Sequence, residues 1–292
     1  MDGVDGIFER YEAIRARLPS GAATGAPQGA SSLLDVAPGV GAFVFDAFGV
    51  LNVGETPIPG AAARLDALRG AGKAVRVLSN AASAGHAATV GKLRRLGMDV
   101  APEEVVTSRQ AALAALDDRL WGCIAMAADD LSDVPGRAVR VDDRAGFDAA
   151  EGVLLLSSAE WDDARQAALA ASLAAKPRPV VVANADLAAP REGAFSREPG
   201  FYGHLLADAG AEVRFFGKPF AEVFALVEAT LPGVAPDRIA MCGDTLHTDI
   251  LGAAARGWRT VLVERDGMFA GADAGAYALR AGIVPDWRVP RI

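Results

Sequence analysis

Short apolar runs alternate with longer mixed segments through the first third of the chain. The runs at 41–45, 74–78 and 105–107 are bounded by glycine or polar residues, which is typical of buried parallel strands. The intervening segments at 60–71 and 85–96 predict helices. Strands that alternate with helices in this rhythm imply right-handed crossovers, so the pattern predicts an α/β fold built on a doubly wound parallel sheet.

The pattern changes between residues 118 and 212, where short apolar strands are separated by acid-rich loops and an alanine-rich helix near 162–175. This indicates a second α/β unit inserted within the first. We therefore expect a discontinuous core domain of residues 39–117 and 213–292 around an inserted domain of residues 118–212. The strands expected where the core resumes are 213–216, 238–241 and 260–263.

Residues 1–38 precede the first predicted strand, and we expect them to form a separate N-terminal helix and arm. An amphipathic helix is predicted over 6–17, and the Gly-, Ala- and Ser-rich stretch 20–32 predicts a loop or flexible arm. The apolar residues at helical spacing are Ile7, Tyr11, Ile14 and Leu18.

Composition narrows the class of protein. The 292 residues are 51% hydrophobic and 23% charged, which is typical of a globular chain, and the net charge of −8 disfavours nucleic acid as a partner. Cys123 and Cys242 lie far apart without metal-type spacing, so a reducing, cytoplasmic location is expected. The acidic first residues are not expected to form a signal peptide, and no apolar run is long enough to predict a membrane span.

Polar groups follow three of the predicted strands. Asp46, Ser79 and Asp244 each come at or just after a strand end, and Lys218 and Asp249 lie in nearby loops. Each group alone is weak evidence, because an Asp after a strand usually forms a turn and a Ser usually caps a helix. Together they supply a nucleophile, donors for phosphate oxygens and carboxylates for a divalent metal, which is the equipment for phosphoryl transfer.

These segments resemble the four motifs of the haloacid dehalogenase (HAD) superfamily, whose members are mostly phosphatases. The long stretch between Ser79 and Lys218 leaves room for the α/β cap of class IIA, the NagD-like branch with a C2-type cap. Residues 182–190 are similar to the Asn-Pro-Asp segment of such caps, with Ala185 in place of the proline. The motifs in chain order are Asp46-Ala47-Phe48-Gly49-Val50, Ser79-Asn80, Gly217-Lys218-Pro219 and Gly243-Asp244 through Asp249-Ile250.

The resemblance implies a Mg²⁺-dependent hydrolase that acts on small phosphorylated metabolites through an aspartyl-phosphate intermediate. It implies that Asp46 and Lys218 are catalytic, and that Ser79, Asn80 and Lys218 bind the phosphate. The implied metal ligands are Asp46, the backbone carbonyl of Phe48, Asp244 and Asp249. It also implies a homodimer, whereas neither nucleic acid nor a membrane is an expected partner.

Phe48 departs from the family pattern, because family phosphatases usually carry aspartate there as general acid and base. The absence of this aspartate is expected to slow the hydrolysis of alkyl phosphate esters most, and Phe48→Asp is expected to raise activity on these esters. Three interpretations remain open: a phosphatase of restricted scope, a dehalogenase-like carbon–halide hydrolase, and a phosphate-ligand binding protein without turnover. Glu55 and His247 are candidate substitute acids, although both are more simply explained as solvated surface residues. Polar candidates for the cap surface are Asp186, Arg191 and Arg197.

Overall fold

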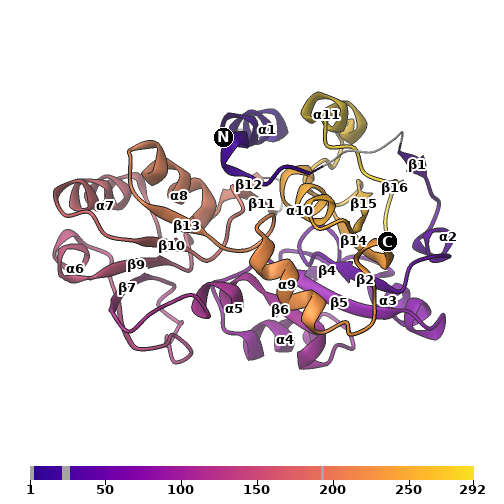
Figure 1. The fold of residues 1–292 in the computed structure, drawn as a ribbon, viewed down its shortest axis with the longest axis horizontal. Coiled ribbons are helices and arrows are strands. Elements are labelled where there is room, and N and C mark those ends of the chain that lie inside the picture. Colours follow the sequence, from indigo (N-terminus) through magenta and orange to yellow (C-terminus); the bar gives the residue numbers. More distant parts are fainter. Residues whose placement is uncertain (1–2, 22–26, 192–193) are drawn as a thin grey trace.

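Two parallel sheets dominate the computed structural model, which describes residues 3–21, 27–191 and 194–292. The larger sheet has seven strands and lies in the right half of Figure 1. All of its neighbouring strands are parallel, which confirms the predicted doubly wound α/β fold. Its strand order is β1 (Gln28–Gly29), β16 (Trp287–Val289), β15 (Arg259–Val263), β14 (Ile239–Gly243), β2 (Ala42–Phe45), β5 (Ala74–Ser79) and β6 (Val105–Thr107).

The smaller sheet, in the left half of Figure 1, has five strands from the middle of the chain. We had placed the strand at 213–216 in the larger sheet, and this was wrong. Val213–Phe215 pairs with Val180–Val182 at the edge of the smaller sheet, and the Phe215 ring stacks on His204, 4.1 Å between ring centroids. A short apolar strand fits either sheet, so its sequence does not tell which one it joins. The order is β13 (Val213–Phe215), β10 (Val180–Val182), β9 (Gly152–Leu155), β7 (Leu120–Ile124) and β8 (Arg137–Arg140).

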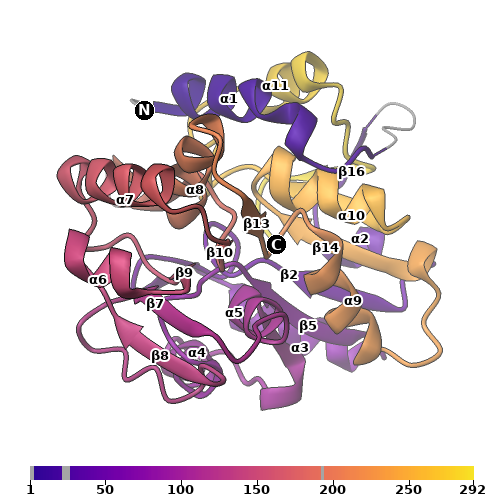
Figure 2. The same ribbon diagram turned by 60° about the vertical axis from the view of Figure 1, so that its left-hand side comes forward.

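Helices cover both faces of the larger sheet (Figures 1 and 2). Phe43 and Phe45 pack with one set of helices and Ala42 and Val44 with the other, so every residue of β2 is buried. The first set is α2 (Leu33–Val36), α3 (Ala61–Gly70) and α4 (His86–Arg95), and the second is α5 (Ser108–Leu113), α9 (Ala221–Ala229) and α10 (Leu251–Ala255).

The smaller sheet is covered on one face by α6 (Arg144–Ala149), α7 (Asp163–Ala175) and α8 (Pro199–Asp208). The alanine-rich α7 begins at Asp162, whose side chain accepts a hydrogen bond from the Arg165 amide and caps the helix. The opposite face, including Leu154 and Val181, joins the apolar cluster of α5 and α9. A domain boundary at 212 would therefore cut off strand β13, and the division into domains stays a prediction.

The N-terminal segment is packed against the rest of the protein. Helix α1 (Gly3–Ala13) ends earlier than predicted and lies beside α11 (Ala274–Ala281) in both ribbon views. Arg280 on α11 lies 2.5 Å from Glu9 on α1, and Tyr277 donates a hydrogen bond to Asp5. The loop or arm expected at 20–32 includes residues 22–26, which lie outside the described residues; its end forms β1.

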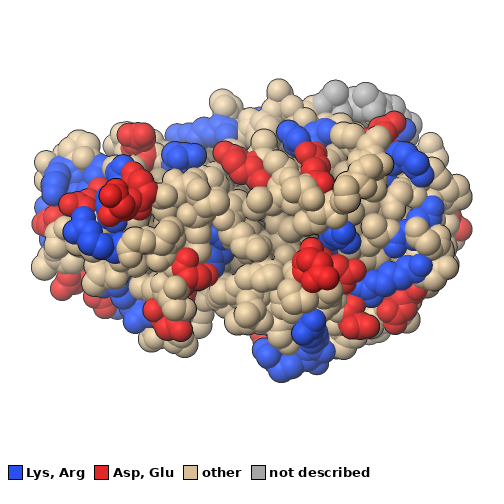
Figure 3. Space-filling model, turned by 60° about the horizontal axis from the view of Figure 1, so that its bottom comes forward, with Lys and Arg blue, Asp and Glu red and all other residues tan. Residues whose placement is uncertain are grey.

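Three small elements lie close to the carboxyl ends of the strands of the larger sheet. They are the hairpin β3 (Asn52–Val53) and β4 (Thr56–Pro57), the hairpin β11 (Ala188–Arg191) and β12 (Ala194–Arg197), and the π-helical turn η4 (Leu246–Ile250). Figure 3 shows acidic and basic side chains interspersed on one face of the molecule. None of the described helices is both long and apolar enough to cross a membrane.

Candidate active site

Three neighbouring strands of the larger sheet bring the predicted polar groups to one edge. Asp46 follows β2, Ser79 ends β5 and Asp244 follows β14, and β2 lies between the other two strands. Because parallel strands point the same way, these side chains meet at the carboxyl edge of the sheet, where α/β proteins bind ligands.

Three carboxylates converge there. Asp46, Asp244 and Asp249 are buried, and one oxygen of each lies within 4.8 Å of the others. Backbone amides hold all three in place: Ala47 donates to Asp46 (2.8 Å), Met268 to Asp244 (2.7 Å) and Thr245 to Asp249 (3.0 Å). These contacts fix which way each carboxylate points.

Two glycines make room for this cluster. Gly49 has a φ of +81°, and a Cβ at that position would lie 2.2 Å from Oδ2 of Asp244. A Cβ at Gly243 would lie 2.2 Å from the Cβ of Asp249. Any larger residue at either position would displace an acid, so the glycines of both motifs are required by close packing.

Lys218 lies among the acids as a buried counter-charge. Its Nζ is 2.5 Å from Oδ1 of Asp46 and 2.8 Å from Oδ1 of Asp249. Burial alone would lower the pKa of Lys218, but Asp249 and Asp46 raise it above its usual value. Burial raises the pKa of Asp46 to about 7 against the opposing effect of Lys218, and burial also raises the pKa of Asp244. One lysine thus compensates only part of the buried negative charge.

The donor set fits a divalent metal ion. Oδ1 of Asp249 is buried, and among the described residues its partner is Lys218 Nζ at 2.8 Å. Three carboxylates face one lysine, so a divalent cation would balance the remaining charge. Carboxylate and carbonyl oxygens without thiols or imidazoles are the ligands that Mg²⁺ prefers.

Asn80 and Ser79 form the adjoining wall. The Asn80 side chain accepts a hydrogen bond from the backbone amide of Lys218 (2.7 Å) and donates one to its carbonyl oxygen (3.0 Å), which fixes the Lys218 loop. Ser79 Oγ accepts from the Ala81 amide (3.2 Å), which leaves its proton free for a further acceptor.

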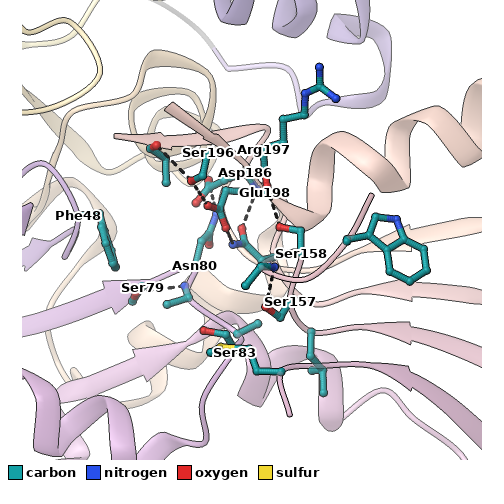
Figure 4. A pocket seen from close by; sticks show the side chains of 18 of the residues that line it. Phe48, Ser79, Asn80, Ser83, Ser157, Ser158, Asp186, Ser196, Arg197 and Glu198 are labelled. Carbon is teal, nitrogen blue, oxygen red and sulfur yellow. Dashed lines mark hydrogen bonds between the residues drawn. The ribbon is translucent and has the colours of Figure 1, made fainter. Parts of the chain in front are cut away.

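A cavity of about 500 Å³ opens in front of these groups, between the two sheets. Figure 4 shows Phe48 on one side, Ser157 and Ser158 on the opposite side, and Asn80 and Asp186 between them. Hairpin β11–β12 adds Arg191 and Arg197, so all three polar candidates from the middle of the chain line this cavity.

Phe48 is held by two cations. Lys92 Nζ lies 4.8 Å and Arg191 Cζ 5.3 Å from the centre of its ring, one from α4 and the other from hairpin β11–β12. The aromatic ring therefore contacts the hairpin through a cation–π interaction, which an aliphatic side chain cannot make. A phenylalanine here supplies no proton, but it forms part of the cavity wall.

Neither substitute acid that the sequence suggested is found in the cavity wall among the described residues. Glu55 is exposed and pairs with Lys92 at 2.6 Å, as expected of a surface residue. For His247 the surface interpretation was wrong. Its ring is buried, lies 2.5 Å from Glu12 and stacks on Tyr11, because η4 packs beneath α1.

Sequence reasoning missed two contributions to the site. Asp186 lines the cavity as expected of a cap-surface residue, but its contact was not foreseen: its Oδ1 accepts a hydrogen bond from Asn80 (2.8 Å), and burial raises its pKa to about 8. The amide of Met268, which fixes Asp244, had no signal in the sequence because a backbone donor is independent of residue type.

Comparison with known proteins agrees with this architecture. Residues 43–129 match the model of the haloacid dehalogenase-like hydrolase family, and residues 215–287 match a second model described as HAD-hydrolase-like. Human glycerol-3-phosphate phosphatase is 30% identical over 260 residues, which cover 76% of this chain and 78% of that protein.

Solved structures share the fold. A possible sugar phosphatase of the HAD superfamily from Cytophaga hutchinsonii has a TM-score of 0.80 at 23% identity, covering 90% of this chain and 98% of that one. A glycerol phosphate phosphatase from Mycobacterium tuberculosis in complex with magnesium has a TM-score of 0.68 at 24% identity, covering 87% and 76%. The chain therefore belongs to the haloacid dehalogenase-like hydrolases, in the NagD-like phosphatase branch of that superfamily.

Proposed function

We propose that the protein is a Mg²⁺-dependent phosphatase of small phosphorylated metabolites in which Asp46 attacks phosphorus. The observation that carries this proposal is the contact of a buried lysine with two of three converging carboxylates at the strand ends. Such a group of charges is costly to bury, and a metal ion together with an anionic ligand would stabilise it.

Each residue has a proposed task. Asp46 forms the aspartyl-phosphate intermediate, while Lys218 keeps the attacking oxygen of Asp46 in place and binds a phosphate oxygen. Ser79 binds a further phosphate oxygen through its hydroxyl, and Asn80 does so through its backbone amide, because both hydrogens of its side-chain amide are donated within the protein. The proposed metal ligands are Asp46, the backbone carbonyl of Phe48, Asp244 and Asp249. Bound Mg²⁺ would neutralise negative charge on the transferring phosphoryl group.

Two observations support a small substrate. The cavity of about 500 Å³ is of the size that holds small metabolites, and serines and arginines line it. The human relative is named for its action on glycerol 3-phosphate, so we propose small phosphate esters of alcohols as the substrate class. The two other interpretations are less favoured. A dehalogenase needs no metal-binding acids, and a binding protein without turnover needs no nucleophile.

The test is phosphate release from p-nitrophenyl phosphate and glycerol 3-phosphate with MgCl₂. We expect release from the aryl ester that Asp46→Asn abolishes and Glu55→Gln leaves unchanged, since Glu55 is exposed and paired outside the cavity. Halide release from a 2-haloacid without metal, or thermal stabilisation by phosphate esters without turnover, would contradict the proposal. The expected homodimer stays a prediction, which light scattering would check.

A further inference from the structure

Phe48 leaves the proposed phosphatase without its usual proton donor, although an alkoxide leaving group needs one. Among the residues that the structure describes, two carboxyl groups besides Asp46 line the cavity, Asp186 and Glu198. Glu198 is held by the hairpin: its carboxylate accepts from Ser196 (2.5 Å) and Arg191 (3.0 Å). Both of these contacts tie the Glu198 carboxylate to the hairpin rather than to the predicted phosphate site.

Asp186 is fixed beside the predicted phosphate site. Its amide donates to Asn184 (2.9 Å), and its Oδ1 accepts from Asn80 (2.8 Å), which also holds the Lys218 loop. Helix α8 packs against its backbone so closely that a Cβ at Gly200 would lie 2.6 Å from the Asp186 carbonyl oxygen. Only one carboxyl oxygen is used, and the residue remains partly exposed to the cavity that Asp46 lines.

Burial favours the protonated form of Asp186 at neutral pH. Burial has the largest effect and raises its pKa to about 8. Asp46 and Asp249 act in the same direction, whereas Lys218 and the hydrogen bond from Asn80 lower the pKa. The remaining titratable group nearby is Tyr11 of α1, whose hydroxyl oxygen accepts a hydrogen bond from the amide after Asp186.

We propose that Asp186, which lines the cavity beside Asn80, is the general acid and base of this enzyme. This rests on the proposed phosphatase function. As Asp46 Oδ bonds to phosphorus and the bond from phosphorus to the ester oxygen breaks, the carboxyl of Asp186 gives its proton to that oxygen, and the alcohol leaves. The Asp186 carboxylate then takes a proton from water as the water oxygen bonds to phosphorus. The bond from phosphorus to Asp46 breaks, which releases phosphate and restores both carboxyl groups.

Asp186→Asn is the decisive variant, because its amide oxygen can still accept the hydrogen bond from Asn80 while the transferable proton is gone. We expect kcat for glycerol 3-phosphate to fall by about 10²–10⁴, the range of general acid–base catalysis. For p-nitrophenyl phosphate, whose leaving group needs no proton, formation of the aspartyl phosphate should be much less affected; the burst of p-nitrophenol reports this step. The control Glu55→Gln should change neither substrate, since Glu55 pairs with Lys92 outside the cavity.

The pH profile adds a second readout. In the wild type, kcat for glycerol 3-phosphate should decline on the alkaline side as Asp186 loses its proton, and Asp186→Asn should lack this decline. If Asp186→Asn lowers the burst and the turnover of glycerol 3-phosphate equally, Asp186 only positions Asn80, and the inference is wrong. Unchanged kinetics of the variant would also contradict it. If the wild type releases phosphate from neither ester, the proposed function itself fails. If the wild type is active and Asp186→Asn has the same kinetics, only the role of Asp186 is contradicted.

Discussion

The wall that the larger sheet gives to the cavity, the charged wall, consists of buried charges in direct contact, whereas the opposite wall carries serines and arginines on loops and a hairpin. Lys218 Nζ lies 2.5 Å from Asp46 Oδ1 and 2.8 Å from Asp249 Oδ1. Ser157, Ser158 and Arg191 instead line open space. The difference teaches how the two walls would divide the proposed reaction: the first would hold the metal ion and the nucleophile, and the second would contact the leaving group.

The largest effect is expected on the charged wall, from Asp244→Asn. The change removes a proposed metal ligand, and a metal supplies several kcal/mol to the transition state, so activity should fall by at least about 10³. Stabilisation by MgCl₂ in thermal unfolding should disappear as well. The matched change on the other wall, Ser157→Ala, should alter kcat/KM by less than about tenfold, since a single neutral hydrogen bond contributes about 1 kcal/mol. Similar losses in the two variants would remove the contrast between the walls.

The variant Lys218→Met tests whether the stability of the buried acids depends on the positive charge of the lysine. The variant leaves Asp46 and Asp249 buried without their cation, which should cost about 3–5 kcal/mol in the free energy of unfolding. MgCl₂ should restore part of this loss, because the ion replaces the missing positive charge. Urea denaturation with and without the salt measures both quantities. Stability unaffected by the substitution would show that the acids are neutral in the fold.

His247→Gln tests the support behind the charged wall, where η4 packs under α1. Burial lowers the pKa of His247 from 6.5 to about 4, so it is neutral when folded but gains a proton when unfolded below pH 6.5. The wild type should therefore lose stability as the pH falls from 6.5 toward 4, by up to about 3 kcal/mol, and the variant should lack this contribution. Urea denaturation of both proteins at pH 7.5 and 5 gives the difference. A difference between them that does not change with pH would contradict the assigned protonation state.

The smallest effect is expected for Phe48→Asp, which tests whether the cavity already contains a general acid. The family pattern alone predicts a large gain on alkyl phosphates, but Asp186 on the opposite wall already serves as acid in our account. We therefore expect the gain in kcat for glycerol 3-phosphate to stay below about tenfold, far under the full range of general acid catalysis. A gain of a hundredfold or more would show that the cavity lacked an acid.

Side chains of both walls were predicted from the sequence, but only for the charged wall could their arrangement be predicted, for a physical reason. Asp46, Ser79 and Asp244 follow strands whose apolar runs can be read from the sequence, and parallel strands bring their ends together. Asp186 stands in a turn before a hairpin, and its burial depends on how the two sheets pack. The same limit explains β13, which joins the smaller sheet, and His247, which α1 covers.

The most direct test is a crystal structure of the protein grown with Mg²⁺ and a fluoride mimic of phosphate. Our account predicts one ion bonded to carboxylate oxygens of Asp46, Asp244 and Asp249, with the mimic between Asp46 and Ser79. The absence of an ion from this position, with the three carboxylates turned away from one another, would contradict it.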